Sequence, residues 1–319
     1  MFWRRDVRHL ANAELQKRLV EARRQSAKSE AWLDLLELAL GESRDGAGWQ
    51  DAAPPPPPQR PVKTPLLFRA HLTVERRTAR RYVHRLLERA ELRLPRLDVA
   101  AFLEAAVCQD DARIDALAAG GDPHPVRVVA QMAVLPLLQA CAHATGWEAP
   151  PSWWEGYCPV CGAWPALAEF RGLERKRWLR CGRCGSGWER EWLRCPFCDE
   201  QSHEQLGYLA PEEGEATRKV EVCDSCKGYL KAHATVSALP PWAVLLEDLT
   251  TVPLDVAALD RGYRRPERPG YALEARVDAR GRWWRFVEAG GGWSRLRRRG
   301  LHHPPSPPPS STDLRQGEA

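Results

Sequence analysis

The sequence of 319 residues lacks the features of exported and membrane-spanning proteins. Arg4 and Arg5 near the N-terminus are not followed by an apolar run, so they do not form an export signal. The longest apolar stretch, from Val126 to Cys141, is interrupted by polar residues and a proline. We expect it to be too short to span a bilayer. These absences predict a cytoplasmic protein that makes no membrane contact.

Catalytic motifs are also missing from the sequence. It contains no phosphate-binding loop, no dinucleotide fingerprint and no paired nucleophile and base. The formal net charge of +5 is small, and much of the basic excess lies in the ends and linkers of the chain. Such a distribution argues only weakly for nucleic-acid binding. We therefore expect a protein that is not an enzyme.

Cysteine is the residue type that carries most information in this chain. Eight of the ten cysteines form four Cys-x-x-Cys pairs, namely Cys158/Cys161, Cys181/Cys184, Cys195/Cys198 and Cys223/Cys226. Such a pair places two thiolates on one tight turn, and two turns supply the four sulfurs of a tetrahedral site. In a reducing compartment, paired cysteines indicate metal ligands rather than disulfides. The sequence therefore predicts two metal ions per chain, each bound by four thiolates.

The residue after each pair indicates how the turn closes. A metal-binding turn of this kind needs a positive backbone φ there, which glycine adopts without strain and aspartate tolerates. Gly162 and Gly185 follow the first two pairs, Asp199 follows the third, and Lys227 follows the fourth with Gly228 one residue later. We expect the fourth turn to be the least regular and to be relaxed by one residue.

The pairing of the four turns is open to two interpretations. Sequential pairing joins the first pair with the second and the third with the fourth, whereas a cross-brace joins the first with the third. We favour sequential pairing, because residues 162–180 are long enough to form a hairpin and Gly185 to Arg194 resembles one continuous strand between the sites. Four thiolates suit either zinc or a single iron ion. A closed site of this kind is structural or carries electrons, and a thioredoxin-like dithiol is the less favoured alternative.

The fold class predicted from these patterns is α+β. An all-helical N-terminal domain is expected over residues 1–150, with a proline-rich linker near 52–65. Two tandem rubredoxin-like or zinc-ribbon modules follow over 151–194 and 195–240. A short helical C-terminal segment covers 241–275, broken at Pro253, and residues 276–319 form a disordered basic tail that includes Arg295 to Arg299.

Within the first domain, apolar spacing predicts several helices. Leucines among charges over residues 8–40 indicate one or two of them. Others are expected over Leu72–Leu92, Val99–Val107, Asp115–Ala119 and Pro125–Thr145, the last being buried and kinked or split at Pro136. We interpret Cys108 and Cys141 on these helices as core residues, and the arginines over 76–85 as a solvated helix face rather than a nucleic-acid surface.

Several motifs resemble the formate dehydrogenase accessory protein family, FdhE. They are residues 157–162 (YCPVCG), 177–181 (RWLRC), 187–189 (GWE), 222–231 (VCDSCKGYLK), 247–250 (EDLT), 254–255 (LD) and 262–265 (GYRR). The resemblance is strong from Tyr157 to Arg265 and weaker in the helical half. It implies a maturation factor that binds the catalytic subunit of a formate dehydrogenase, with the eight paired cysteines holding iron in a rubredoxin-like setting.

The alternative function is a zinc-ribbon protein that binds nucleic acid. We disfavour it because Trp178, Trp188 and Trp192 are interleaved with Glu189 and Glu191, and acidic residues repel a phosphate backbone. Self-association stays open. The aromatic residues before the first pair could bind a partner or could only join the domains, and two histidines could support the metal sites or be ordinary surface residues; these are Trp153, Trp154, Tyr157, His203 and His233.

Overall fold

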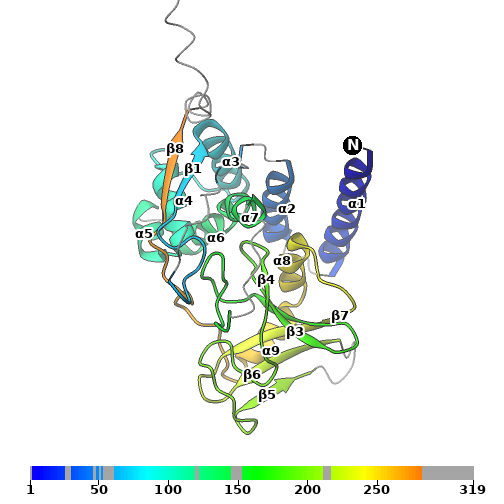
Figure 1. The fold of residues 1–319 in the computed structure, drawn as a ribbon. Coiled ribbons are helices and arrows are strands. Elements are labelled where there is room, and N and C mark those ends of the chain that lie inside the picture. Colours follow the sequence, from blue (N-terminus) through cyan, green and yellow to red (C-terminus); the bar gives the residue numbers. More distant parts are fainter. Residues whose placement is uncertain are drawn as a thin grey trace, which may run out of the picture. The chain divides into compact units, whose positions relative to one another are not determined.

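Helices form most of the N-terminal half in a computed structural model of the chain (Figure 1). They are α1 (Phe2–Gln25), α2 (Glu30–Asp45), α3 (Arg76–Arg89), α4 (Val99–Cys108), α5 (Asp111–Leu117), α6 (Pro123–Ala133) and α7 (Leu135–Ala144). Acidic side chains begin four of these helices by accepting bonds from free backbone N–H groups, as Asp98 does from Ala100 and Ala101. The predicted helices therefore have local sequence signals at their starts.

The structure describes residues 2–25, 30–45, 48–49, 52, 61–118, 122–144, 153–210 and 217–281. The chain divides into one unit, Met1–Gly281, and a second unit, Arg282–Ala319. The proline run Pro54–Pro58 and the basic run Arg295–Arg299 lie outside the described residues.

The N-terminal half is not all-helical, contrary to the prediction. Leu72 lies in a strand, β1 (His71–Glu75), and the helix expected from that residue begins only at Arg76. β1 pairs in parallel with β8 (Arg276–Arg280), at the start of the segment predicted to be a tail. The strand forms because Leu72 and Val74 are buried against the helices and Val277 is buried beside them.

The long apolar segment is divided into α6 and α7 at Val134, with Pro136 in the first turn of α7 as predicted. By length and composition alone, Pro123–His143 could cross a membrane, contrary to our expectation, but 72% of its apolar stretch is buried within the protein. Val129, Ala133 and Leu137 have no exposed surface and form part of one core with Leu36 and Phe102. The segment therefore serves as the core helix pair of this half.

A six-stranded sheet forms the second half and follows the order β4-β3-β2-β7-β6-β5. Its strands are β2 (Leu167–Arg171), β3 (Lys176–Arg180), β4 (Gly187–Glu189), β5 (Leu206–Leu209), β6 (Arg218–Cys223) and β7 (Tyr229–Thr235). Each trio, β2–β4 and β5–β7, is antiparallel, and β2 joins β7 in parallel. The two predicted ribbons are therefore repeats of one topology that share a continuous sheet.

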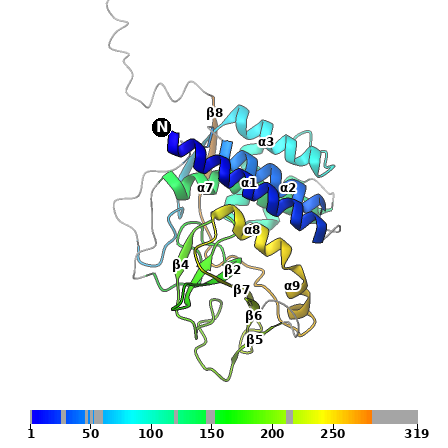
Figure 2. The same cartoon turned by 90° about the vertical axis from the view of Figure 1, so that its right-hand side faces the viewer.

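Two helices cover part of one sheet face (Figure 2). They are α8 (Pro241–Thr250) and α9 (Val252–Leu259), and Pro253 lies in the first turn of α9, where the helical segment was predicted to break. Val220 and Tyr229 pack against Ala258 of α9, while Arg18 of α1 lies 5.9 Å above the ring of Trp242 on α8. α8 thus lies between the sheet and the N-terminal helices.

Candidate metal centres

All four cysteine pairs form the same backbone turn. The N–H of each first cysteine donates to the carbonyl five residues later, over 2.8 Å from Cys158, 2.9 Å from Cys181, 2.9 Å from Cys195 and 3.0 Å from Cys223. This bond fixes the turn without using either sulfur. The main chain alone therefore presents both thiols of each pair on one side.

The residue after each second cysteine adopts a positive φ, as predicted. The values are 70° at Gly162, 77° at Gly185, 69° at Asp199 and 56° at Lys227. The relaxed fourth turn was a wrong prediction, because Lys227 itself adopts the left-handed conformation, whereas Gly228 has no positive φ. Glycine is also sterically required at the first site, since a Cβ on Gly162 would lie 2.7 Å from the carbonyl oxygen of Tyr271.

The thiols gather into two groups of four that follow sequential pairing. Centre 1 consists of Cys158, Cys161, Cys181 and Cys184, and centre 2 consists of Cys195, Cys198, Cys223 and Cys226. Within each group the sulfur atoms lie within 4.8 Å of one another. The two turns of each centre are thus close enough to act on one ion.

Sulfur spacing tests whether these groups fit a tetrahedral metal. Metal–sulfur bonds of about 2.3 Å in a tetrahedron place the sulfurs about 3.8 Å apart. In centre 2, both Cys195–Cys226 and Cys198–Cys223 are separated by 3.7 Å. In centre 1, Cys158–Cys184 and Cys161–Cys181 are separated by 3.4 and 3.5 Å. Both groups fit an ion of the size of zinc or iron.

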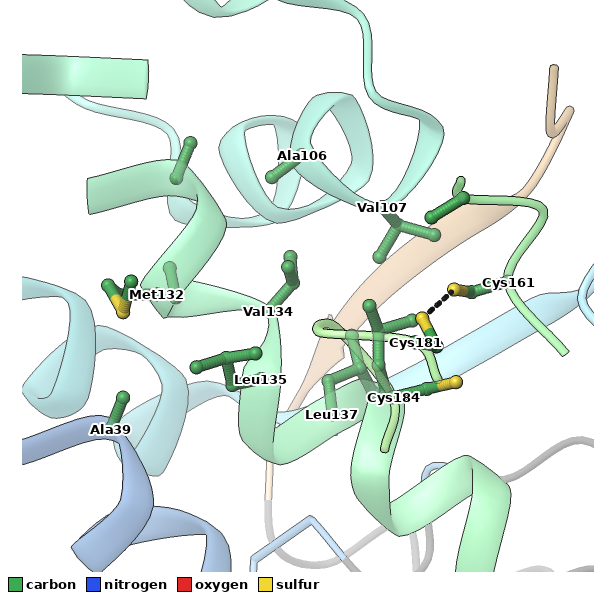
Figure 3. Close-up of a cluster of buried hydrophobic side chains, with 14 of the residues drawn as sticks. Ala39, Ala106, Val107, Met132, Val134, Leu135, Leu137, Cys161, Cys181 and Cys184 are labelled. Atoms are coloured by element: carbon green, nitrogen blue, oxygen red, sulfur yellow. Dashed lines mark hydrogen bonds between the residues drawn. The ribbon is translucent and has the colours of Figure 1, made fainter. Parts of the chain in front are cut away.

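Centre 1 is buried inside the helical core (Figure 3). Its four cysteines are 2% exposed or less, and Val107 and Leu137 belong to the same core. The N–H groups of Val160 and Arg183 each point at a cysteine sulfur over 3.4 Å. These dipoles favour the thiolate form, which the apolar surroundings would otherwise disfavour. A bound cation would offset the remaining cost of burying the thiolates.

Centre 2 is open to solvent on one side. Cys195 and Cys223 are buried, whereas Cys198 and Cys226 are exposed. Its turns are stabilised by polar contacts, since Arg194 binds both carboxylate oxygens of Asp199, and Arg190 also contacts this carboxylate. The hydrogen bonds from Arg194 hold the pKa of Asp199 below its ordinary value. The two centres therefore differ in accessibility as well as in sequence.

Two segments of the N-terminal half hold the two turns of centre 1 in place. The N–H groups of Leu66 and Leu67 donate to Pro159 and Val160 over 2.8 and 3.0 Å. Arg183 in the second turn donates to the carbonyls of Ala106 and Val107 at the end of α4. Centre 1 thus connects the sheet to the helices.

The predicted aromatic cluster divides into residues with different surroundings. Trp153 is 7% exposed and donates to the carbonyl of Tyr157 over 3.1 Å, while the Tyr157 hydroxyl donates to the backbone carbonyl of Lys63 over 2.7 Å. Trp154 is 53% exposed. Tyr157 packs edge-on against Trp164, which packs in the same manner against Phe197 in the third turn. Trp153 and Tyr157 therefore join parts of the protein, and only Trp154 presents a large free surface.

The two histidines and the two remaining cysteines considered as possible ligands lie outside both centres. His203 is exposed, and His233 lies on β7 with Nδ1 3.4 Å from Glu247. Cys141 is fully buried, and desolvation raises the pKa of its thiol to about 12. Cys108 is half-buried and donates to the carbonyl of Ala275. Both cysteines contribute to packing, as predicted.

One partly buried ionic network was not predicted from the sequence. Lys231 on β7 lies 2.9 Å from Asp248 on α8 and 2.6 Å from Asp255 on α9. Arg265 contacts the same two carboxylates at 2.6 and 3.1 Å, and the Tyr229 hydroxyl donates to Asp255. The motifs VCDSCKGYLK, EDLT, LD and GYRR contain these charges, but the spacing of the motifs along the chain does not place the charges together. The network fixes α8 and α9 on the second ribbon.

Comparison with known proteins finds a family match in the C-terminal part of the chain. Residues 193–269 match the domain described as "FdhE, C-terminal domain". A Protein FdhE homolog of Rhizobium meliloti is 34% identical over 115 residues, covering 34% of this chain and 37% of that protein. Protein FdhE of Escherichia coli is 31% identical over 111 residues, covering 34% of this chain and 35% of that protein. The matched stretch thus spans about a third of these relatives.

A solved structure is similar over more of the chain. The FdhE protein of Pseudomonas aeruginosa shares 20% sequence identity, with a TM-score of 0.49, over 81% of this chain and 94% of that one. The sequence matches confirm the predicted resemblance to FdhE.

Proposed function

Because residues 193–269 match the FdhE C-terminal domain, we propose that this protein is an accessory factor for formate dehydrogenase. It binds the catalytic subunit of that enzyme in the cytoplasm and is required for the enzyme to become active, without catalysing a reaction itself. The match is the observation that carries this proposal. The structure contributes a chemical reason for the cysteine motifs, because the paired cysteines within and beside them gather into two groups of four.

We propose that all eight paired cysteines are metal ligands. Centre 1 would be held by Cys158, Cys161, Cys181 and Cys184, and centre 2 by Cys195, Cys198, Cys223 and Cys226. An ion bound by four thiolates has no open position for a substrate, so it stabilises the turns or, if it is iron, exchanges one electron. The protein itself supplies the N–H groups that point at the sulfurs and the apolar shell around centre 1.

Deletion of the gene tests the accessory role. The deletion strain should lose formate dehydrogenase activity while still making the catalytic subunit, and the wild-type gene should restore it. A variant with all eight paired cysteines changed to serine should not restore activity. Restoration by this variant would show that the metal centres are dispensable, and undiminished activity in the deletion strain would refute the accessory role.

Partner capture provides an independent test. The full chain, purified without oxygen, should retain the catalytic subunit from a lysate of its own organism and should contain close to two equivalents of iron plus zinc. The nucleic-acid alternative is not favoured by the comparisons. It would require binding to DNA or RNA that weakens steeply with salt, and we expect no such dependence.

A further inference from the structure

β4 is an edge strand, and no described segment forms backbone hydrogen bonds with its outer side. Its inner side faces β3, since the N–H of Arg190 donates to the carbonyl of Arg177 and the same register places Trp188 opposite Leu179. In antiparallel pairing, alternate residues bond to one neighbour. The backbone groups of Gly187 and Glu189 therefore point away from β3, and they have no backbone partner within the described part of the chain.

This free edge borders a cleft of about 770 Å³. The cleft lies between β4, the end of α7 and the start of α8, and Figure 1 shows β4 at the border of the sheet near both helices. Four tryptophans line it: Trp153, Trp154, Trp178 and Trp188. Trp154 is the most accessible of them, with 53% of its surface exposed. The cleft therefore combines unpaired main-chain groups with aromatic surface, as peptide-binding sheet edges do.

One carboxylate at the edge of the cleft is free to meet a basic side chain. The lining arginines are already paired, Arg171 with Glu169 at 2.5 Å and Arg190 with Asp199. Glu191 contacts Arg194 at 3.4 Å. Glu189 is exposed on the free edge and has no ion pair with any described residue. At the free edge itself, the Glu189 carboxylate is thus available to a basic side chain of a ligand.

We infer that the β4 edge and its cleft bind an extended segment of a partner polypeptide. The segment adds to β4 as a further strand, bonds to the backbone of Gly187 and Glu189, places a basic side chain near the Glu189 carboxylate and packs apolar side chains on the tryptophans. This inference rests on the proposed function, in which the partner is the formate dehydrogenase catalytic subunit. It adds the location and the chemistry of the contact.

Substitutions at Glu189 separate the backbone hydrogen bonds of this contact from its charge interaction. Glu189→Pro removes the outward N–H and the charge but leaves the bonds of Trp188 and Arg190 to β3, because proline is tolerated at an edge. Glu189→Ala removes only the charge, and Glu189→Lys reverses it. Glu204→Lys is the matched control, since Glu204 is an exposed glutamate on the turn before β5 and lies outside the cleft. Unchanged metal content and circular dichroism would show that each variant is folded.

The experiment measures capture of the catalytic subunit by each full-length variant and binding of overlapping peptides that cover its sequence. Wild type and Glu204→Lys should bind equally, whereas Glu189→Pro and Glu189→Lys should bind about tenfold more weakly and Glu189→Ala should lie between. Hydrogen exchange should slow at Gly187 and Glu189 when a basic peptide binds.

The outcomes distinguish this inference from the proposed function. If wild type captures no catalytic subunit, the proposed function fails. If wild type captures the subunit and all Glu189 variants capture it equally well, the proposed function stands and the β4 site is refuted. Capture of the folded subunit without binding of any peptide, or peptide binding without protection of Gly187 and Glu189, would also overturn the β4 site.

Discussion

Arg177 on β3 and Glu221 on β6 form an ion pair that spans the two strands between them. The Nη2 to Oε2 distance is 2.6 Å, and Arg177 is 3% exposed. The same guanidinium donates to the carbonyls of Glu191 and Arg194 over 3.0 and 3.1 Å. One side chain therefore joins the first ribbon, the second ribbon and the connection between them.

Removal of this guanidinium should destabilise the protein strongly. We expect Arg177→Met to lower the free energy of unfolding by about 3 kcal/mol, because it leaves the Glu221 carboxylate and two carbonyls without their donor. Denaturant unfolding would measure the change. Lys176→Met on the same strand removes an exposed charge and should stay within about 0.5 kcal/mol of wild type. Equal stability of the two variants would contradict this role.

The two centres should lose metal in order. Centre 2 exposes Cys198 and Cys226, whereas centre 1 is closed by the helical core, so a chelator should remove the first equivalent from centre 2. Metal release from wild type should therefore have a fast phase from centre 2 and a slow phase from centre 1. Cys198→Ser should abolish the fast phase and leave the slow phase. Cys158→Ser should also lower the unfolding midpoint, because centre 1 joins sheet and helices. Single-phase loss of both equivalents from wild type would be inconsistent with unequal centres.

Gly185 should not tolerate a side chain. Its φ is 77°, and an added Cβ would clash with Pro241 at the start of α8. We expect Gly185→Ala to cost more than about 1 kcal/mol of stability and to accelerate metal release. Gly41→Ala is the matched control, since Gly41 lies in α2 with nothing near its added Cβ, and alanine there should stabilise the helix by about 0.5–1 kcal/mol. A neutral effect at Gly185 would argue against the strained turn.

Acid should weaken the network around Asp248. Burial alone would raise the pKa of this carboxyl, but Arg265 and Lys231 outweigh it and hold the pKa below its ordinary value. The contribution of the ionised Asp248 carboxylate to the free energy of unfolding is thus complete above the unfolded-state pKa of about 4. It is lost as the pH falls through the lower folded-state pKa. The stability difference between wild type and Asp248→Asn should be largest near neutral pH and shrink in acid. Acid would also release any bound metal from both proteins, so only the difference between them tests the network.

The metal centres were predictable because they depend on residues within each turn. Contacts between distant segments of the chain were not predictable in this way. The positive φ after each cysteine pair follows from residues within the turn, as at Gly162 and Asp199. The continuous strand expected from Gly185 to Arg194 was wrong, because only Gly187–Glu189 is extended and Arg190 and Arg194 turn towards Asp199. The polar alternation of these residues matched a strand, but ion pairs decided their conformation.

The same limit explains the missed strand in the N-terminal half. Leu72 lies eleven residues before Val83, a spacing of about three helical turns that matches one helix face, whereas the step of two residues from Leu72 to Val74 matches a strand. Their strand conformation depends on β8, whose pairing partner cannot be recognised from local sequence. The parallel β2–β7 contact was missed for the same reason, although each ribbon taken alone has the predicted hairpin and turns.

The two parallel pairings also determine when the sheets can form during synthesis of the chain. β1 leaves the ribosome long before β8, and β2 leaves well before β7. Both early strands therefore stay unpaired on that side until their partners have been synthesised. All four cysteines of centre 1 are synthesised after β1 and before β7 and β8, while their sheet is still incomplete. The last residues of β8 therefore close the structure only when nearly the whole first unit has been synthesised.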